Sequence, residues 1–169
     1  VNDNQLLQLH GDQVEERSAE LANLVADYYR LSNLDPPVAI RLVAQQTWVN
    51  GNPFQYVDAG NGEVEHSNLL SDFCGWRRNP QLNPIEHDNG QLLSGANFRS
   101  NTLGFAWVGS MCSGGTTCGV NQMTNSNPAA NAAVLAHELG HNFGMRHDST
   151  GTNTCPQSGF IMNAVGCSN

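Results

Sequence analysis

Hydrophobic residues recur at helical spacing in the first part of the chain. Between residues 14 and 31 they fall on one face of a helix, while charged residues cover the opposite face. The apolar positions are Val14, Leu21, Leu24, Val25, Tyr28 and Leu31, and the charged positions are Glu15, Glu16, Arg17, Glu20 and Asp27. The pattern predicts an amphipathic helix over this range.

The middle of the chain contains weaker patterns. After two prolines, residues 38–49 are rich in β-branched and aromatic side chains and are predicted to form a strand. Ser67 is predicted to cap a second helix that runs toward Trp76, and residues 103–108 are predicted to form another strand. The small and polar residues 109–127 predict a loop.

The most regular helix is predicted after Asn127. Asparagine is favoured at a helix N-cap, and Pro128 fits the first helical position because its missing N–H costs nothing there. Strong helix formers fill residues 129–143, and Gly144 suits the left-handed conformation that ends many helices. The residues after Gly144 show no regular pattern. The order of elements predicts a single α/β domain over residues 1–169 with an irregular C-terminal part.

Composition narrows the class of protein. The chain has 169 residues, 39% of them hydrophobic, with 17 glycines and seven prolines, which is typical of one globular domain. Fifteen acidic residues against seven arginines give a net charge of −8, which argues against nucleic acid and anionic membranes as partners. No stretch approaches the ~18 apolar residues that a membrane-spanning helix needs, so we expect no membrane insertion by this segment.

Five cysteines lie between residues 74 and 167, and no two of them form a CxxC pair. They are Cys74, Cys112, Cys118, Cys155 and Cys167. Spread cysteines of this kind indicate the disulfides of an exported protein, and buried free thiols are the alternative. The odd number leaves one cysteine free or partnered outside this segment.

The segment HELGHNFGMRHD, residues 137–148, carries the chemistry. His137 and His141 are four residues apart, so on a helix they project from one face and can bind a single zinc ion. Gly144 allows the chain to turn back and to bring His147 in as the third ligand. Three neutral nitrogens leave a fourth position open to water, as in a catalytic zinc site.

Glu138 follows the first of these histidines, and there its carboxylate can take a proton from a zinc-activated water. The alternative is an ordinary amphipathic helix whose histidines bond to neighbouring groups. That alternative does not explain why Gly144 and His147 stand at the positions that the zinc motif requires. The sequence therefore predicts a catalytic zinc site with Glu138 as general base.

The spacing HExxHxxGxxH is the metzincin signature. With Asp148 directly after the third histidine, the chain resembles the adamalysin (reprolysin) branch, which includes snake-venom metalloproteases and the ADAM and ADAMTS enzymes. Four further segments are similar to this family. They are Phe160-Ile161-Met162-Asn163 (the Met-turn), HDNGQLL at 87–93, LGFAWVGSMC at 103–112 (the edge strand and following loop), and residues 68–76, which end in FCGW.

The resemblance implies a metzincin α/β (α+β) fold. Such a fold has a twisted, mostly parallel sheet with an antiparallel edge strand, a long active-site helix and an irregular C-terminal subdomain. The resemblance makes Met162 the apolar floor beneath the zinc ligands, although a lone methionine is also ordinary core filling. It implies that a protein or peptide substrate lies along the edge strand Gly104, Phe105, Ala106 and Trp107, beside an apolar pocket that gives selectivity. The family's first strand and far C-terminus are expected to be missing in part, so residues 1–169 are interpreted as a trimmed catalytic domain.

The resemblance also bears on calcium and on the disulfides. In the family, the aspartate at the position of Asp88 helps to bind a structural Ca²⁺; its partners come from the first strand and the far C-terminus, and a simple turn residue is the alternative. The ADAMTS arrangement implies the pairs Cys74–Cys118 and Cys155–Cys167, with Cys112 bonded outside this segment. The pair Cys112–Cys167 is the rival arrangement.

The sequence thus predicts a zinc metalloendopeptidase that acts on extracellular protein substrates and is secreted or forms the exterior part of a cell-surface protein. An inhibitory pro-segment is expected elsewhere in the precursor. The alternative is a catalytically silent adamalysin-like module that keeps zinc for stability and binds partners. Silent relatives often lack the glutamate or a histidine, whereas this chain has all four residues.

Overall fold

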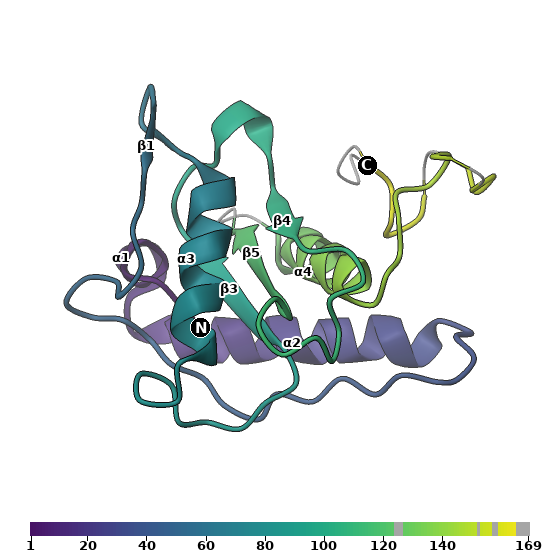
Figure 1. Cartoon of the computed structure of the whole chain (residues 1–169), viewed down its shortest axis with the longest axis horizontal. Coiled ribbons are helices and arrows are strands. Elements are labelled where there is room, and N and C mark those ends of the chain that lie inside the picture. The colour runs from purple at the N-terminus through teal and green to yellow at the C-terminus, as the bar shows by residue number, and fades with distance from the viewer. Residues whose placement is uncertain (124–126, 152, 157–158, 165–169) are drawn as a thin grey trace.

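A three-stranded sheet with helices on both faces forms the centre of the computed structural model (Figure 1), which describes residues 1–123, 127–151, 153–156 and 159–164. The helices are α1 (Asn4–His10), α2 (Val14–Leu31), α3 (His66–Arg78) and α4 (Pro128–Asn142), with short 3₁₀ turns at Gly11–Gln13 and Arg99–Asn101. The strands are β1 (Asp58–Gly60), β2 (Glu63–Val64), β3 (Gly90–Ser94), β4 (Gly104–Ala106) and β5 (Cys118–Gln122).

The sheet has the order β3-β5-β4, and β1 with β2 forms a separate antiparallel hairpin. Strands β3 and β5 are parallel, from the pair Gly90–Cys118 to the pair Ser94–Gln122. Strand β4 is antiparallel to β5 and forms the edge. Asn2 adds isolated parallel bridges to Leu93 and Thr47 on the other side of the sheet. The predicted mixed α/β fold with an antiparallel edge strand is confirmed.

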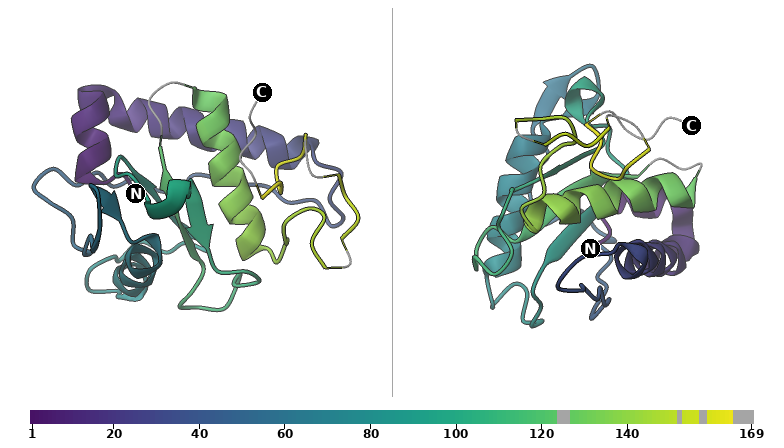
Figure 2. Two further views of the ribbon diagram at one scale, coloured as in Figure 1. Left: turned by 90° about the horizontal axis from the view of Figure 1, so that it is seen from above. Right: turned by 90° about the vertical axis from the view of Figure 1, so that its right-hand side faces the viewer.

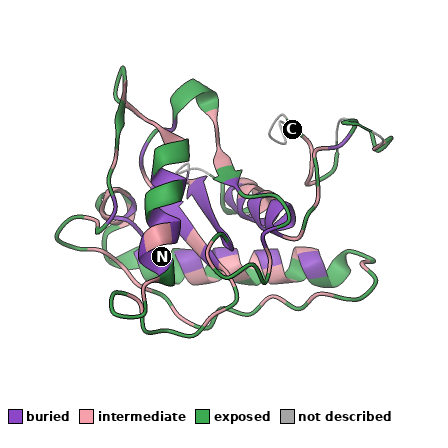
Figure 3. Ribbon diagram, in the orientation of Figure 1, coloured by how far each residue is buried: buried purple, intermediate pink, exposed green. Residues whose placement is uncertain are grey.

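Two hydrophobic clusters cover the two faces of the sheet. Figure 2 shows the helices on either side of the sheet, and Figure 3 shows β3 and β5 coloured mainly as buried. Leu92 and Leu93 are neighbours in β3 and belong to different clusters because successive side chains of a strand point to opposite faces. Leu93 packs with α1, α2 and α4, through residues such as Leu21, Val25, Leu135 and Leu139. Leu92 packs with α3, through residues such as Leu69, Phe73 and Trp76. The sheet is thus the middle layer of three.

Helix α2 has the predicted bounds, and its buried stripe includes Val14, Leu21 and Val25. Leu31, predicted to lie on the apolar face, is 69% exposed at the end of the helix. Tyr29 continues the buried stripe instead, and its hydroxyl donates a hydrogen bond to the carbonyl of Ala136 in α4 at 3.0 Å. This bond satisfies the polar tip of a side chain that joins the two helices.

The predicted strand over residues 38–49 is wrong. Only the part around Thr47 pairs with another segment: Asn2 donates to the Gln46 carbonyl at 2.8 Å, and Trp48 donates to the Asn2 carbonyl at 3.1 Å. Leu42 and Val43 are 51% and 66% exposed. Preference for strand describes side chains that fit a half-buried pleated surface, and these residues have no sheet beside them.

The predicted loop over residues 109–127 is also wrong in part, because it contains β5, the central strand. The polar residue Asn121 is fully buried there, and its amide donates to Gln91 Oε1 at 2.9 Å and to the Leu92 carbonyl at 3.0 Å. A strand that buries a polar side chain in this way has no hydrophobic signature in the sequence. Helix α3 begins one residue before Ser67, after Glu65, and its N-cap has no side-chain hydrogen bond, so the predicted Ser67 cap is wrong.

Helix α4 begins as predicted. Asn127 Oδ1 accepts hydrogen bonds from the backbone N–H groups of Ala129 at 3.0 Å and Ala130 at 3.4 Å, and Pro128 is the first helical residue. Gly144 has φ +97°, which is the left-handed conformation expected at the end of the helix. The helix packs against α2 and β5, and the described residues after it form no further helix or strand.

The predicted disulfide Cys74–Cys118 is present and joins α3 to the central strand β5, with a Cα–Cα distance of 5.9 Å. Cys112 and Cys155 are exposed and form no disulfide with a described residue. Cys167 lies outside the described residues, and so do both of the pairings predicted for it. No helix in the described ranges is long and apolar enough to cross a membrane.

Candidate metal centre

Three histidines meet at the C-terminal end of α4. His137 and His141 lie one helical turn apart, and His147 lies in the segment that turns back after Gly144. The Nε2 atom of His147 is 3.1 Å from that of His137 and 3.2 Å from that of His141, and the three ligand atoms all lie within 4.8 Å of one another. In the described part of the chain, no other group of three potential ligands has such spacing.

The second nitrogen of two of these rings faces a backbone carbonyl. His137 Nδ1 is 2.6 Å from the Ile161 carbonyl, and His141 Nδ1 is 2.8 Å from the Met145 carbonyl. Because a carbonyl only accepts, each Nδ1 must carry the proton, which leaves the Nε2 lone pair free to bind a metal. The fold thus fixes both the orientation and the tautomer of two predicted ligands.

The donor set fits zinc. Tetrahedral bonds of about 2.0–2.1 Å place two nitrogen ligands about 3.3–3.4 Å apart, close to the Nε2 distances of 3.1 and 3.2 Å. Burial lowers the pKa of His137 to about 4 and also lowers the pKa of His141, so both rings are neutral at physiological pH. Neutral imidazoles are the form that binds a metal.

Glu138 is 4% exposed, and its side chain extends from α4 toward Gly104 of the edge strand. Its Oε2 atom has no hydrogen-bond partner among the described residues, and burial raises the pKa of its carboxyl group to about 8. A Cβ atom on Gly104 would lie only 2.5 Å from the Glu138 Cγ, so glycine at that position makes room for the carboxylate. A buried carboxylate without a partner favours a cation beside it, which is the second observation that fits a metal at this site.

The chain reverses directly after His141. The backbone N–H groups of Gly144 and Met145 donate to the carbonyls of His141 at 2.8 Å and Gly140 at 2.9 Å. These bonds close the end of α4 and direct His147 back toward the two helical histidines. The predicted role of Gly144 as the turning residue agrees with this geometry.

Met162 lies against the turn of α4 that carries the first two histidines. A Cβ atom on Gly140 would lie 2.6 Å from the Met162 sulfur, so the glycine leaves the space that this side chain fills. The carbonyl of Met162 accepts a hydrogen bond from the N–H of Asp148 at 2.9 Å. Asp148 is buried, and its Oδ2 has no partner among the described residues. The structure therefore brings both predicted marker residues to the site.

An open cleft of about 1150 Å³ runs past the histidines. Its walls come from β4, from α4 and from the segment after the third histidine. They include Gly104, Phe105, Ala106, Ala130, Ala133, Val134, Arg146, Ile161, Asn163 and Ala164. Trp107, predicted as part of the edge strand, follows β4, does not line the cleft and is 44% exposed.

Two residues within the motif have places that the sequence pattern did not indicate. Arg146 lines the cleft, and Asn142 is fully buried at the end of α4. The available signals were a charged residue directly before the third histidine of the motif and an amide residue in the last turn of the predicted helix.

Asp88 is exposed, and its carbonyl accepts a hydrogen bond from the guanidinium of Arg77 at 3.0 Å. No cluster of potential metal ligands that includes Asp88 is found in the described ranges. The calcium site therefore stays a prediction.

The chain is similar to several proteins over most of its length. It is 39% identical over 138 residues to human (Homo sapiens) disintegrin and metalloproteinase domain-containing protein 19, covering 82% of this chain and 13% of that protein. It is 33% identical over 156 residues to snake venom metalloproteinase atroxlysin-1 of Bothrops atrox, covering 92% of this chain and 72% of that protein. The chain thus spans about an eighth of the first relative.

Comparison with solved structures gives the same fold. One match, described as the structure of a chaperone-substrate complex, has a TM-score of 0.66 and 17% sequence identity and covers 98% of this chain and 27% of that one. The model of the family described as Reprolysin (M12B) family zinc metalloprotease matches residues 1–169. The chain therefore belongs to the reprolysin (M12B) family of zinc metalloproteases.

Proposed function

We propose that residues 1–169 form the catalytic domain of a zinc endopeptidase that hydrolyses peptide bonds in extracellular protein or peptide substrates. The observation that carries this proposal is the convergence of three Nε2 atoms beside the unpartnered carboxylate of Glu138 in an open cleft. His137, His141 and His147 would hold the metal. Zinc in that place supplies a Lewis acid that polarises the scissile carbonyl and acidifies the attacking water.

Glu138 is the proposed general base. Its carboxylate accepts a proton from the attacking water and later delivers that proton to the leaving amine, so the group ends each cycle as it began. The contact with Gly104 holds the carboxylate on the cleft side of α4. Because no protein group competes for Oε2 in the described part of the chain, the carboxylate is free to bond to water.

The substrate is proposed to bind along β4. One edge of β4 pairs with β5, and the other edge borders the cleft with its backbone groups available. An extended peptide that adds to this edge would gain backbone hydrogen bonds that fix its orientation with little dependence on sequence. Small and apolar residues of α4 (Ala130, Ala133, Val134), together with Ile161 and Ala164, line the proposed selectivity pocket beside the histidines.

Arg146 is proposed to add a charge preference. Its guanidinium forms no ion pair with a described residue, and Glu138 is the one acidic residue among the described residues that line the cleft. A peptide with a carboxylate near the scissile bond would offer Arg146 a partner. The Cys74–Cys118 disulfide supports the further proposal that the protein is exported, because such bonds persist in oxidising compartments.

The test is hydrolysis of a quenched fluorescent peptide by the purified domain. We expect cleavage that a chelator abolishes and stoichiometric zinc restores, with about one zinc per chain by elemental analysis. Full activity of the chelated protein would exclude a metalloprotease. A protein that binds one zinc and cleaves no peptide in a diverse library would indicate the silent interaction module instead.

A further inference from the structure

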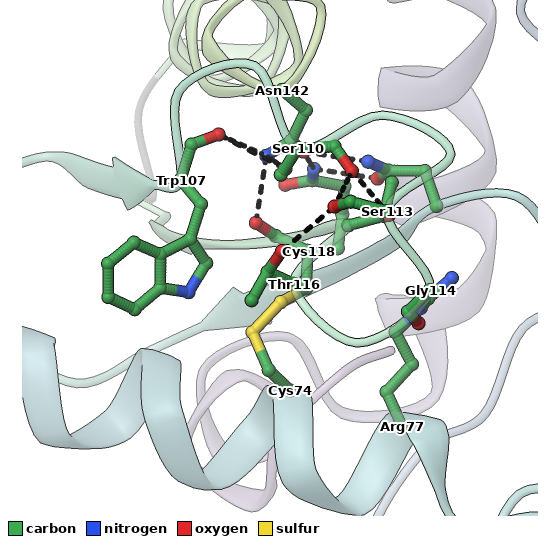
Figure 4. Close-up of a disulfide and its surroundings, with 12 residues drawn as sticks. Cys74, Arg77, Trp107, Ser110, Ser113, Gly114, Thr116, Cys118 and Asn142 are labelled. Atoms are coloured by element: carbon green, nitrogen blue, oxygen red, sulfur yellow. Dashed lines mark hydrogen bonds between the residues drawn. A yellow bond between two sulfur atoms is a disulfide. The ribbon is translucent and has the colours of Figure 1, made fainter.

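Asn142, the last residue of α4, is fully buried, and both sides of its side-chain amide are hydrogen-bonded (Figure 4). Its Nδ2 lies within hydrogen-bond distance of three acceptors, and its Oδ1 accepts from two donors. The acceptors are the carbonyls of Trp107 and Cys118 and the Ser110 hydroxyl, each at 3.0 Å, and the donors are Asn89 Nδ2 at 2.7 Å and Gln91 Nε2 at 3.0 Å. Such an amide can be replaced only by leaving several buried groups unpaired.

The partners of Asn142 belong to separate parts of the site. Gln91 lies in β3, and Cys118 lies in β5 and is bonded through its sulfur to α3. Trp107 and Ser110 lie in the loop that follows the edge strand β4. Figure 4 shows the amide above this loop, with the disulfide on the far side of the Cys118 backbone.

Backbone hydrogen bonds join the same loop to the same helical turn. Gly109 N–H donates to the His141 carbonyl at 2.8 Å, and Met111 N–H donates to the Asn142 carbonyl at 2.9 Å. The last carbonyls of a helix have no partner within the helix, and its last turn frays unless other groups bind them. Here the loop after the edge strand supplies two such groups in addition to the N–H groups of Gly144 and Met145. The Asn142 side chain adds hydrogen bonds from the helix end to the loop and to the sheet.

We propose that Asn142 is a positioning residue that holds His141 and the loop after the edge strand in a fixed relation. This inference rests on the proposed zinc site. The Asn142 side chain makes no hydrogen bond to the histidine rings; it acts through the backbone of the preceding residue, His141, and through the Trp107 carbonyl. Partners that orient a ligand typically change metal affinity 10- to 100-fold when removed, and we expect loss of the helix-end anchor to act on His141 in the same range.

The experiment compares Asn142→Ala with Asn121→Ala. Asn121 is equally buried, but its side-chain amide binds Gln91 and Leu92 of β3 and makes no hydrogen bond to α4. Both variants should lower the unfolding temperature of the metal-free protein, because both leave buried groups unpaired. Only Asn142→Ala should raise the zinc Kd, by about 10- to 100-fold in competition with a chromophoric chelator. Its KM for a peptide should rise as well, because the loop after the edge strand loses its anchor.

A milder variant keeps the test decisive if Asn142→Ala does not fold. Ser110→Ala removes one acceptor of the amide and should raise the zinc Kd about 2- to 10-fold, the value of one hydrogen bond. A zinc Kd that is the same in Asn142→Ala and Asn121→Ala, or unchanged in Ser110→Ala, would overturn the positioning role. A wild-type protein that binds zinc and cleaves no peptide would overturn the proposed function instead, so the two failures are distinguishable.

Discussion

The two halves of the proposed metal centre are built in different ways. His137, Glu138 and His141 come from α4, whose other side is buried against α2 and the sheet through residues such as Ala132, Ala136 and Leu139, none more than 7% exposed. His147 and Met162 come from the segment after Gly144, which has no helix or strand in its described part. Much of that segment is exposed, including Phe160 at 52% (Figure 3).

The segment after Gly144 takes its position from the helix. Met145 N–H bonds to the Gly140 carbonyl, the Ile161 carbonyl accepts from the His137 ring, and the Met162 side chain fills the space left by Gly140. Two of the proposed ligands are therefore held by the core without a metal, whereas the third depends on a few contacts at the site itself. The difference predicts that metal stabilises the second half far more than the first.

The largest effect should come from Glu138→Gln, which changes the chemistry of the helical half and leaves both halves in place. The amide has nearly the same shape but cannot accept the proton of water, so kcat should fall by about 10²- to 10⁴-fold. Zinc content and the thermal unfolding temperature should stay near wild type, because Glu138 is not one of the three clustered ligands. Near-normal turnover by a zinc-loaded variant would remove Glu138 from the mechanism.

Removal of the metal tests whether the second half depends on the metal more than the helical half does. Hydrogen exchange followed by mass spectrometry on chelated and zinc-loaded protein should show faster exchange in residues 145–148 and 159–164 after chelation. The amides of α4 should keep their protection, because helix burial does not depend on the metal. Equal loss of protection in α4 would show that the helical half also needs the metal to form.

The same contrast explains what could be predicted from the sequence. The helical half follows from local rules: Asn127 as cap, Pro128 at the first position, histidines one turn apart and Gly144 at the end are all present in the structure. The zinc-ligand spacing is likewise local, because i and i+4 share a face of any helix. The resemblance to a known family was needed to assign Met162, whose contact with Gly140 spans 22 residues.

Nonlocal pairing accounts for the wrong predictions. Residues 38–49 have the composition of a strand but reach a partner only near Thr47, whereas β5 has a polar composition and becomes the central strand. The burial of Asn121 and Asn142 could not be predicted for the same reason. In a sequence an asparagine indicates a surface position, and only the structure shows the partners that allow its amide to be buried. The two members of such a pair lie too far apart in the chain for a local sequence pattern to include both.

Substitution of Met162 should have an effect of intermediate size and should show whether the second half is stabilised mainly by the metal. Met162→Leu is close in volume and should cost less than about 1.5 kcal/mol. Met162→Ala opens a space beside the histidine-bearing turn, and at this half-buried position it should cost near the lower end of the about 2–5 kcal/mol range. The cost should appear mainly as weaker zinc binding, measured by chelator competition, because the side chain belongs to the metal-dependent half.

Met123→Ala is the matched control for Met162→Ala. Met123 is 3% exposed in the core cluster that includes residues of α2 and α4, and it does not line the cleft that the three histidines line. Its loss should lower the free energy of unfolding in urea and leave the zinc Kd unchanged. If both alanine variants change the same quantity, the two halves are not separately stabilised. A direct bond between the Met162 sulfur and zinc in a metal-loaded structure would refute its packing role.

The smallest expected effect concerns selectivity, which the irregular half should supply through Arg146. This residue lies between Met145 and the proposed ligand His147, lines the cleft and is exposed. An exposed ion pair contributes about 0.2–1 kcal/mol, so a peptide with a glutamate near the scissile bond should exceed its glutamine analogue by about 1.5- to 5-fold in kcat/KM. The preference should shrink in high salt, disappear in Arg146→Ala and invert toward basic peptides in Arg146→Glu.

Arg41→Ala removes an exposed charge that does not line the cleft and serves as the control for net charge. Zinc Kd should be unchanged in all three variants. If the glutamate peptide keeps its advantage in Arg146→Ala, the charge preference arises elsewhere in the cleft and the irregular half contributes only its ligand and its packing.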